Sequence, residues 1–392
     1  MPVAEPEPQP ALEGDKGRVM LNKLNLHSDK IIVIKIVDDF LVGVGTTAPV
    51  GCISSDFLHE LRYNGVNYFL PFTSWGMIER KPGEYKAQPC PGVECIAWLG
   101  ESGAVLNGHC FVFLLDEWWS VPTFAHDCPF EEQKEMLENF IRNTVARFPE
   151  IRIWTLNEPV AQNCLGWSRE QIYDVFIAAS GWVHEVNPQA KVMVNLIPIE
   201  CNWGGLDYVP SQVADDLFES GLEADIIGIE LYYWWAPDEQ RDENGYPSLD
   251  WVRSIVDIFR KHDLPIIFSE VGAPGIMEER DQYEQQADWM EAFFRFCHDD
   301  EDIIGATWYF TIDDTFMPYA GLANDNYTLR PCGERLLEIA ETFNPSQEYT
   351  LEEKEYLDLE PGEYDLIINA ELPQIREIYR VNVVRGESVS PY

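Results

Sequence analysis

Basic residues are scarce in this chain of 392 amino acids. Lys and Arg together number 27, of which ten are Lys, whereas Asp and Glu number 68, so the formal net charge at pH 7 is −41. Such a chain repels phosphate groups, and the attraction behind most nucleic-acid binding is electrostatic. We therefore expect no nucleic-acid partner. The acidic excess fits adaptation to salt or an ordinary acidic hydrolase, and composition does not choose between them.

Long apolar runs are missing too. No run of about 18 apolar residues occurs, so we expect no membrane-spanning helix and no membrane partner. The first 15 residues are rich in Pro and Glu. They do not resemble a signal peptide, and we expect them to be a disordered lead. The oligomeric state is not fixed by any of these features.

Clustered metal ligands and cysteine repeats are also lacking. The nine Cys form no C-x-x-C repeat, and the seven His are spread singly along the chain. We therefore expect no metal site. Cys90 and Cys95 could pair, but buried free thiols in a reducing compartment are the simpler interpretation. It slightly favours a cytoplasmic location, although secretion stays open.

Aromatic residues, by contrast, are plentiful, with 13 Trp, 17 Tyr and 20 Phe. This load exceeds what a core of this size requires. Ligand sites are lined predominantly by apolar and aromatic side chains, and ring faces suit the apolar faces of sugars. A carbohydrate is therefore a reasonable partner.

Two apolar stretches each end in a glutamate. Residues 152–160 read R-I-W-T-L-N-E-P-V, and Pro159 cannot donate to a sheet ladder, so the strand should stop with Glu158 at its carboxyl end. Residues 265–272 read P-I-I-F-S-E-V-G and place Glu270 similarly, before a turn at Gly272. Two carboxylates at the carboxyl ends of separate parallel strands suit acid–base and nucleophilic work on a glycosidic bond. The alternative is a pair of solvated glutamates.

Apolar runs alternate with amphipathic segments from residue 40 to residue 343. Strands are expected at 40–44, 66–72, 104–115, 152–158, 191–199, 225–234, 265–272 and 303–310. Helices are expected at 54–61, 94–100, 131–148, 170–186, 211–221, 249–262, 280–298 and 334–343. Eight strands alternating with eight helices predict an α/β fold, the (β/α)8 TIM barrel. Ser168 should cap the fourth helix, and Met136, Phe140, Thr144 and Phe148 should share one side of the third.

The flanking segments differ from the barrel pattern. Residues 349–359, 364–372 and 378–384 alternate with period two and predict strands. We therefore expect a disordered lead at 1–15, accessory strands at 16–38, a catalytic barrel at 39–344 and a small β domain at 345–392. This C-terminal β appendage could bind sugar, but packing against the barrel is the favoured role.

Further polar and aromatic side chains fall at the expected strand ends. Asn157 precedes Glu158 and can hold a sugar 2-hydroxyl, a bond that strengthens at the transition state. His109, on the third strand, is either a satisfied structural residue or a sugar ligand. Trp308, on the eighth strand, is a candidate floor for the reacting sugar.

The sixth strand adds a third carboxylate. Glu230 and Tyr232 lie two residues apart and therefore share one face of the strand. Tyr232 could donate to Glu270 and keep it ionised. Three ionised carboxylates in one place would repel each other, so Glu230 should either bind a sugar hydroxyl or be turned away by a basic or hydroxyl partner.

These residues stand in motifs that resemble a known family. The segments are G-H-C-F-V-F (108–113), W-T-L-N-E-P (154–159), I-I-G-I-E-L-Y-Y (226–233), F-S-E-V-G (268–272) and G-A-T-W-Y-F-T-I-D-D-T-F (305–316). They are similar, in order, to G-H-T-L-V-W, W-D-V-V-N-E, I-G-x-Q-x-H, T-E-L-D and G-V-T-V-W-G-x-x-D-x-x-S-W of the retaining endo-β-1,4-xylanases of glycoside hydrolase family 10. Residues 320–331 resemble that family's G-L-F-D…K-P ending.

The resemblance implies a role for each matching residue. Glu158 would be the acid/base and Glu270 the nucleophile, with their carboxyl groups about 5–5.5 Å apart and the higher pKa on Glu158. Asn157, His109 and Trp308 would line the subsite of the bond being cut. No cofactor is needed for this chemistry.

The departures from the family concern the sugar next to the cut. The family's N-x-M-K-W on the second strand reads P-F-T-S-W here, so Pro71 and Ser74 replace its Asn and Lys, and only Trp75 is kept. Phe113 and Phe316 stand where the family has Trp. We therefore expect a divergent member that uses xylan poorly, with an exo-acting β-glycosidase on short glycosides and a non-catalytic sugar-binding barrel as alternatives.

Overall fold

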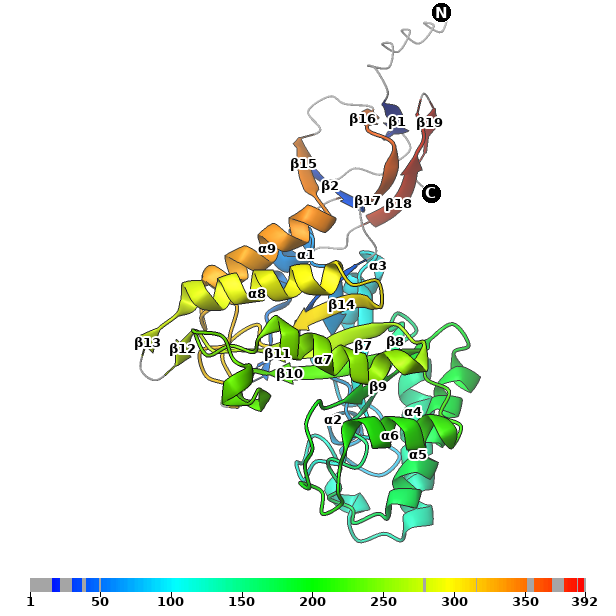
Figure 1. Ribbon diagram of the computed structural model, residues 1–392. Coiled ribbons are helices and arrows are strands. Elements are labelled where there is room, and N and C mark those ends of the chain that lie inside the picture. Colours follow the sequence, from blue (N-terminus) through cyan, green and yellow to red (C-terminus); the bar gives the residue numbers. More distant parts are fainter. Residues whose placement is uncertain are drawn as a thin grey trace, which may run out of the picture. The chain divides into compact units, whose positions relative to one another are not determined.

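The computed structural model describes residues 16–21, 30–36, 40–48, 51–277, 280–314, 316–350, 356–368, 377–385 and 387–390 (Figure 1). The chain divides into two compact units. One runs from Asp39 to Thr342, and the other combines the two chain ends, Met1–Asp38 and Phe343–Tyr392. The disordered lead expected at 1–15 lies outside the described residues.

The larger unit contains a closed barrel of eight parallel strands, which confirms the expected (β/α)8 fold. Its strand order is β10-β11-β14-β3-β6-β7-β8-β9, so each strand pairs with the next along the chain and β14 closes the ring against β3. The strands are β3 (Leu41–Gly45), β6 (Tyr68–Leu70), β7 (Val105–Phe111), β8 (Ile153–Asn157), β9 (Lys191–Leu196), β10 (Ile226–Tyr232), β11 (Ile266–Gly272) and β14 (Ile303–Trp308).

A helix follows each barrel strand. The helices are α1 (Ser55–Tyr63), α3 (Val93–Glu101), α4 (Phe130–Arg147), α5 (Arg169–Val186), α6 (Pro210–Glu219), α7 (Leu249–Phe259), α8 (Tyr283–His298) and α9 (Pro331–Phe343). The predicted Ser168 cap is confirmed: its hydroxyl accepts from the Gln171 amide, and the Gln171 side chain accepts from the Ser168 amide. Short elements fill the loops: β4 (Thr47–Ala48), β5 (Gly51–Cys52), α2 (Trp75–Ile78), β12 (Ile276–Met277) and β13 (Arg280–Asp281).

Several expected boundaries and faces were wrong in detail. The third strand ends at Phe111 and not at residue 115, because Val112 adopts a positive φ of 50° that breaks the extended conformation. Helix α8 begins at Tyr283 and not at residue 280, because Arg280 is in the β12–β13 hairpin. On α4 the buried face includes Leu137, whereas Met136 is only half-buried.

The barrel interior changes from apolar to polar along its strands. Its apolar part contains Leu41, Tyr68, Leu70, Ile153, Met193, Ile226 and Ile267. Further toward the carboxyl ends, the Thr155 hydroxyl donates to Oδ1 of Asn107 at 2.7 Å, and Nδ2 of Asn107 donates to the Tyr68 hydroxyl at 2.7 Å. Because strand side chains alternate with period two, these positions continue to Asn157 and His109. Polar groups therefore converge on the carboxyl end.

The smaller unit is a β structure made from both ends of the chain. One sheet has the order β16-β1-β19 and the other β15-β2-β17-β18. The strands are β1 (Gly17–Met20), β2 (Lys30–Ile36), β15 (Ser346–Thr350), β16 (Tyr356–Leu359), β17 (Gly362–Ile368), β18 (Glu377–Val383) and β19 (Ser388–Val389). The single strand expected at 349–359 was wrong, because β15 and β16 belong to different sheets.

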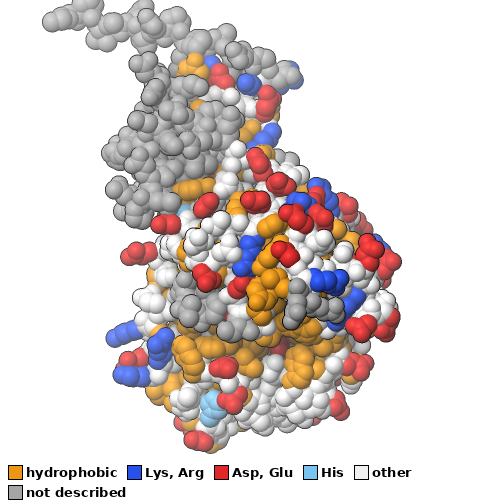
Figure 2. Space-filling model, turned by 90° about the vertical axis from the view of Figure 1, so that its left-hand side faces the viewer, with side chains coloured by type: hydrophobic (Ala, Val, Ile, Leu, Met, Phe, Trp, Pro, Cys, Tyr) orange, Lys and Arg blue, Asp and Glu red, His pale blue; other side chains and the backbone are white. Residues whose placement is uncertain are grey.

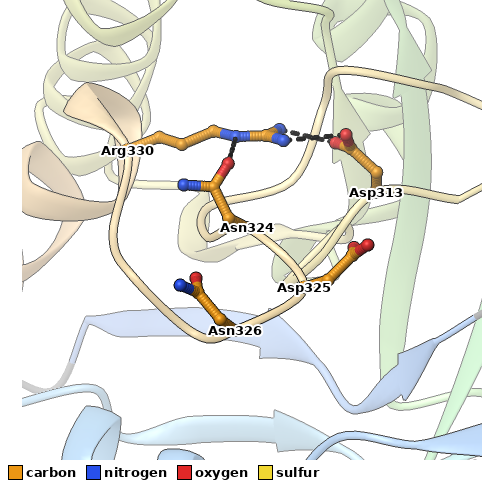
Figure 3. Close-up of a pocket in the computed structure, with 5 residues that line it drawn as sticks. All are labelled: Asp313, Asn324, Asp325, Asn326 and Arg330. Carbon is orange, nitrogen blue, oxygen red and sulfur yellow. Dashed lines mark hydrogen bonds and ion pairs between the residues drawn. The ribbon is translucent and has the colours of Figure 1, made fainter.

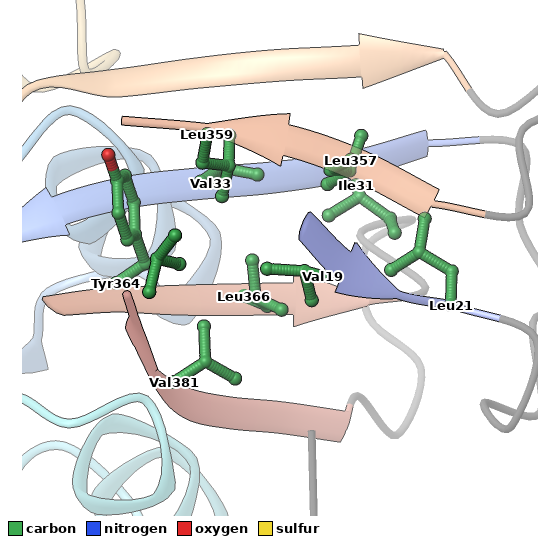
Figure 4. Packing of buried hydrophobic residues seen from close by; sticks show 10 residues of the cluster. Val19, Leu21, Ile31, Val33, Leu357, Leu359, Tyr364, Leu366 and Val381 are labelled. Carbon is green, nitrogen blue, oxygen red and sulfur yellow. The ribbon is translucent and has the colours of Figure 1, made fainter. Parts of the chain in front are cut away.

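Side chains from both sheets form the core of this unit (Figure 4). Val19 and Leu357 come from one sheet and Val33 and Leu366 from the other, and all four are buried. At this burial, an apolar side chain contributes about 1.5–3 kcal/mol to stability. The unit therefore has a hydrophobic core of its own.

Candidate active site

Three carboxylates are buried at the carboxyl end of the barrel. Glu158 follows β8, Glu230 lies on β10 and Glu270 lies on β11, and their exposed fractions are 8 %, 2 % and 5 %. Glu230 and Glu270 are direct neighbours in the register of β10 and β11. Buried carboxylates are costly unless they are hydrogen-bonded or protonated, so their partners determine what they can do.

Asn195 on β9 hydrogen-bonds to polar side chains of three other segments of this centre. Its Nδ2 lies 2.7 Å from Oδ1 of Asn157, 2.8 Å from Oε1 of Glu230 and 3.3 Å from Oε1 of Glu270. Its Oδ1 accepts from the Ser269 hydroxyl. One buried amide thus holds side chains from β8, β10 and β11 in a fixed arrangement.

The β10–β11 register explains how two consecutive residues reach this amide. Ile229 pairs with Phe268 but Glu230 pairs with Glu270, so the register shifts and Ser269 is the extra residue. A regular strand would send Ser269 and Glu270 to opposite faces. The bulge allows both to contact Asn195. Gly228 makes room, because a Cβ there would lie 2.5 Å from Oδ1 of Asn195.

Glu270 is surrounded by hydrogen-bond donors. The Tyr232 hydroxyl donates to its Oε2 at 2.5 Å, and Nε2 of His109 lies 3.2 Å from its Oε1. Asn195 adds a longer contact at 3.3 Å. Donors directed at a carboxylate stabilise its charged form, so Glu270 is arranged to be an anion.

Glu158 occupies the opposite kind of environment. Burial, and then the charge of Glu270, raise its pKa from 4.5 to about 8, although the Gln162 side chain offsets part of this. Within the described structure, its Oε2 has no hydrogen-bond donor. Its backbone is strained, with φ at 48°, and its amide donates to the Asn195 carbonyl at 3.0 Å. Such strain costs about 1–3 kcal/mol and is typical of functional sites.

The charges of both other carboxyls act on Glu230. Burial raises its pKa well above the usual range, and the charges of Glu158 and Glu270 raise it further. Nδ2 of Asn195 donates to its Oε1 at 2.8 Å. Among the described residues, no basic or hydroxyl side chain turns Glu230 away, and this amide is its hydrogen-bond partner.

Aromatic side chains border the centre beside His109. The His109 ring lies 5.7 Å from that of Phe72 and 5.8 Å from that of Tyr309. Trp119 continues this wall, 5.0 Å from Phe72 and 5.8 Å from Phe113. Phe113 and Phe72 therefore both contact the Trp119 ring.

A second aromatic wall adjoins Glu270. Tyr232 stacks on Trp234 at 5.1 Å, and Phe316 lies 5.1 Å from Trp234 and 5.4 Å from Tyr232. Phe316 is 59 % exposed. Trp235 and Trp203 extend the wall in another direction, with ring centroids 6.4 Å apart. Exposed rings next to a buried polar centre can stack on a planar or sugar-like ligand.

Two of the expected sugar contacts lie elsewhere. Trp75 is buried, stacks on Phe140 of α4 and donates from Nε1 to Glu79 at 2.7 Å. Trp308 is fully buried, lies 6.3 Å from Trp289 of α8 and donates from Nε1 to the Ala320 carbonyl. Neither ring is brought to the carboxylates. Tyr309, the next residue along from Trp308, has that position.

Sequence reasoning missed Asn195, Ser269 and Tyr309. Asn195 did leave a signal, because it is an amide within the apolar run V-M-V-N-L-I at 192–197. A buried polar side chain in such a run needs partners, and at a strand end those partners are functional candidates. Ser269 left none, because the bulge depends on the pairing of two strands.

A polar hollow lies in the loop between β14 and α9 (Figure 3). It has a volume of about 370 Å³ and is lined by Asp313, Asn324, Asp325, Asn326 and Arg330. Arg330 donates to both carboxylate oxygens of Asp313, at 2.6 and 2.8 Å, and to Oδ1 of Asn324 at 3.0 Å. Asp313 and Arg330 neutralise each other, so the buried carboxylate centre is the stronger candidate for chemistry.

Acidic side chains spread over the face of the molecule in Figure 2, and basic ones lie among them. Arg335, for example, pairs with Asp288 and Glu291.

Within the ranges that the structure describes, no group of three or more His, Cys, Asp and Glu is placed to hold a metal ion. None of the described helices has the length and apolar character needed to cross a bilayer. The Cys90–Cys95 pair was wrong, since Cys90 is in a disulfide and Cys95 is free.

Solved structures that match this fold include several xylanases. No family model matches the chain, and no curated protein sequence does. Xylanase 10B of Thermotoga petrophila, solved with xylobiose, is 21 % identical over 78 % of this chain and 94 % of its own, with a TM-score of 0.58. Xylanase 10C of Cellvibrio japonicus, solved with xylopentaose, is 14 % identical over 79 % and 68 %, with a TM-score of 0.58. An endo-1,4-β-xylanase of Caldicellulosiruptor owensensis is 16 % identical over 76 % and 97 %, with a TM-score of 0.54. The chain therefore has the fold of the family 10 xylanases.

Proposed function

We propose that this chain is a divergent glycoside hydrolase of family 10 and cleaves β-linked sugars with retention of configuration. Glu158 is the acid/base and Glu270 the nucleophile. The supporting observation is the contrast between these two carboxyls: Tyr232, His109 and Asn195 favour the anion of Glu270, while burial and the charge of Glu270 raise the pKa of Glu158 to about 8. A retaining glycosidase needs this division between an ionised nucleophile and a protonated acid.

In the first step the glycosidic bond is exchanged for an ester. Oε1 or Oε2 of Glu270 attacks the anomeric carbon, and the bond from that carbon to the leaving oxygen breaks. The leaving oxygen keeps the electron pair and takes the proton of Glu158. The result is a glycosyl ester on Glu270 and a carboxylate on Glu158.

In the second step Glu158 acts as a base. It takes a proton from water while the water oxygen attacks the anomeric carbon, and the ester bond to Glu270 breaks. Glu270 leaves as a carboxylate and Glu158 is protonated again. Two inversions at one carbon give net retention, and no metal or cofactor takes part.

Carbohydrate is the proposed substrate class, with a preference for short glycosides over xylan. The Ser74 hydroxyl donates to the Trp119 carbonyl at 2.5 Å, and Trp75 points to α4, so neither offers a polar group to a distal sugar. Phe72 and Trp119 offer ring surface instead. Exo-action on a β-glycoside is therefore the favoured second candidate. Residues 39–344 would carry the activity, with 16–38 and 345–392 as an accessory module.

Covalent trapping tests the proposal. The protein is incubated with a panel of activated 2-deoxy-2-fluoro β-glycosides and analysed by intact mass and peptide mapping. We expect one sugar to be attached, on Glu270, and NMR of early hydrolysis products to show the β-anomer. An inverted product, or a sugar attached to Glu158, contradicts the assignment. Binding without turnover of any glycoside indicates a non-catalytic barrel.

A further inference from the structure

Asn195 is a buried amide to which the two steps above assign no part. It lies on β9 and has no exposed surface. Its Nδ2 lies 2.7 Å from Oδ1 of Asn157 and 2.8 Å from Oε1 of Glu230, with a longer contact of 3.3 Å to Oε1 of Glu270. An amide nitrogen carries two hydrogens, so the two short contacts account for both.

The surrounding oxygens select one orientation of the Asn195 amide. Reversed, the amide would place its Oδ1 against the carboxyl oxygens of Glu230 and Glu270. An amide oxygen is an acceptor only, and it has nothing to donate to a carboxylate. In the observed orientation Oδ1 instead accepts from the Ser269 hydroxyl. The amide is therefore held at both its nitrogen and its oxygen.

The orientation of Asn195 in turn fixes that of Asn157. Because Nδ2 of Asn195 donates, the oxygen of Asn157 must face it and the nitrogen of Asn157 must face away. That nitrogen lies 3.3 Å from Oε1 of Glu158, a long contact that involves one of its two hydrogens. The other hydrogen has no partner among the described contacts, although the side chain is 1 % exposed. A buried donor of this kind is a candidate for a ligand contact.

We propose that Asn195 is a positioning residue that holds the Asn157 amide with its nitrogen toward the reacting sugar, so that Asn157 donates to the sugar 2-hydroxyl. This inference rests on the proposed function, in which Glu270 attacks that sugar. The bond to the 2-hydroxyl strengthens at the transition state, so a donor that is oriented in advance lowers the barrier.

Ser269 acts behind Asn195 in this arrangement. It is the extra residue of the β10–β11 bulge, and its hydroxyl holds the oxygen of Asn195. The bulge on the strand of the nucleophile thus orients a donor on β8, the strand that leads to the acid/base.

A substrate without the 2-hydroxyl separates this role from a merely structural one. The probes are the para-nitrophenyl β-glycosides of xylose, glucose and galactose, each with its 2-deoxy counterpart, and kcat/KM is measured on the full-length protein. We expect Asn195→Ala to lose roughly tenfold more kcat/KM on a parent glycoside than on its 2-deoxy counterpart. Asn157→Ala should lose the same discrimination, and adding Asn195→Ala to it should change the ratio no further.

Ser269→Ala is a second, smaller change. The described contacts of its hydroxyl are Asn195 and the Ile229 carbonyl, and they include neither Glu270 nor Asn157. We expect the ratio to shift in the same direction by roughly threefold.

Asn107→Ala is the matched control. Asn107 is another fully buried amide of the barrel, but it bonds to Tyr68 and Thr155 and not to the carboxylates. Any loss of kcat/KM that it causes should be the same on a parent glycoside and on its 2-deoxy counterpart.

An unchanged ratio in Asn195→Ala overturns the proposal, because Asn195 then acts on Glu270 or on folding alone. If Asn195→Ala does not fold, Ser269→Ala decides, and an unchanged ratio there overturns it. If the wild type cleaves none of the probes, the proposed function fails, and binding of the same glycosides is compared by calorimetry. A 2-hydroxyl preference that the variant loses then leaves the inference standing, whereas one that it keeps, or none in the wild type, overturns it.

Discussion

The hydroxyl of Tyr232 donates to Oε2 of Glu270 at 2.5 Å, within a centre where both residues are at least 95 % buried. Burial raises the pKa of Tyr232 well above its usual range, and the charge of Glu270 raises it further, so the phenol stays a donor. A neutral phenol stabilises the anion without neutralising it. Tyr232 therefore keeps Glu270 nucleophilic and oriented at the same time.

Tyr232→Phe should slow formation of the glycosyl–enzyme, because a hydrogen bond to a charged group is worth about 1.5–3 kcal/mol. We expect kcat/KM to fall by roughly 10–100-fold on an aryl β-glycoside, measured by stopped-flow release of the phenol. Tyr246→Phe is the control, because this buried hydroxyl donates to the backbone carbonyls of Pro274 and Gln282. Equal losses in both variants would assign Tyr232 a structural role alone.

Stability should depend on pH through Glu158. Its pKa is about 8 in the folded protein, against an ordinary value of 4.5. Between these values the folded protein retains a proton that the unfolded chain has released. The free energy of unfolding therefore falls as pH rises through this window, by roughly a few kcal/mol.

Glu158→Gln removes this dependence. The variant should melt near the wild-type temperature around pH 4.5 and above it at about pH 8, as measured by calorimetry across the window. The exposed Glu135→Gln on α4 should show no such trend. A wild-type curve parallel to that of Glu158→Gln would mean that Glu158 is already ionised in the folded protein at low pH.

Gly228→Ala tests how closely the centre is packed. The added Cβ would lie 2.5 Å from Oδ1 of Asn195 and 3.0 Å from the Met193 sulfur, so the amide must shift. We expect destabilisation of about 1–3 kcal/mol. The loss of activity should be larger than the decrease in the folded fraction alone would cause. Gly181→Ala on α5 is the control, since a Cβ there meets nothing within 4 Å and should stabilise the helix by up to about 1 kcal/mol.

Substrate length should separate this chain from its structural neighbours. We expect kcat/KM on xylohexaose to be lower than on short aryl β-glycosides, because the distal position lacks the Asn and Lys donors and an unpaired buried hydroxyl costs about 1–3 kcal/mol. Ser74→Lys restores one donor and should improve xylohexaose selectively. A strong wild-type preference for xylohexaose, with xylobiose as the main product, would show that other residues hold the distal xylose.

Features that depend on short stretches of sequence, such as the strand ends and the order of strands and helices, could be predicted. Pro159 and Gly272 mark where two strands stop, and each stop leaves a glutamate at the carboxyl end. The barrel, confirmed here, follows from the alternation of apolar runs with helices. These features depend on a few neighbouring residues and so are visible in the sequence.

What depends on the pairing of distant segments could not be predicted. The Ser269 bulge exists only in the register between β10 and β11, and it decides that Ser269 joins Glu270 at Asn195. Which of Trp308 and Tyr309 faces the carboxylate centre could not be predicted either. The alternation of side chains along a strand requires that one of the two face it, but does not say which. The separation of β15 from β16 depends on partners, β2 and β1, that lie more than 300 residues earlier.

The pairing of β1 with β16 has a consequence for biosynthesis. Arg18 and Asp358, which join these strands by a two-fold hydrogen bond, are 340 positions apart in the chain. During synthesis from the N-terminus, β1 and β2 must therefore stay unpaired until β15, β16 and β17 have been made, by which time every barrel strand is present. Closing so long a loop is slow when the intervening chain is random, and fast when that chain has already condensed. Folding of the barrel thus brings β1 and β2 close to the strands that follow α9, and the small unit assembles after the barrel.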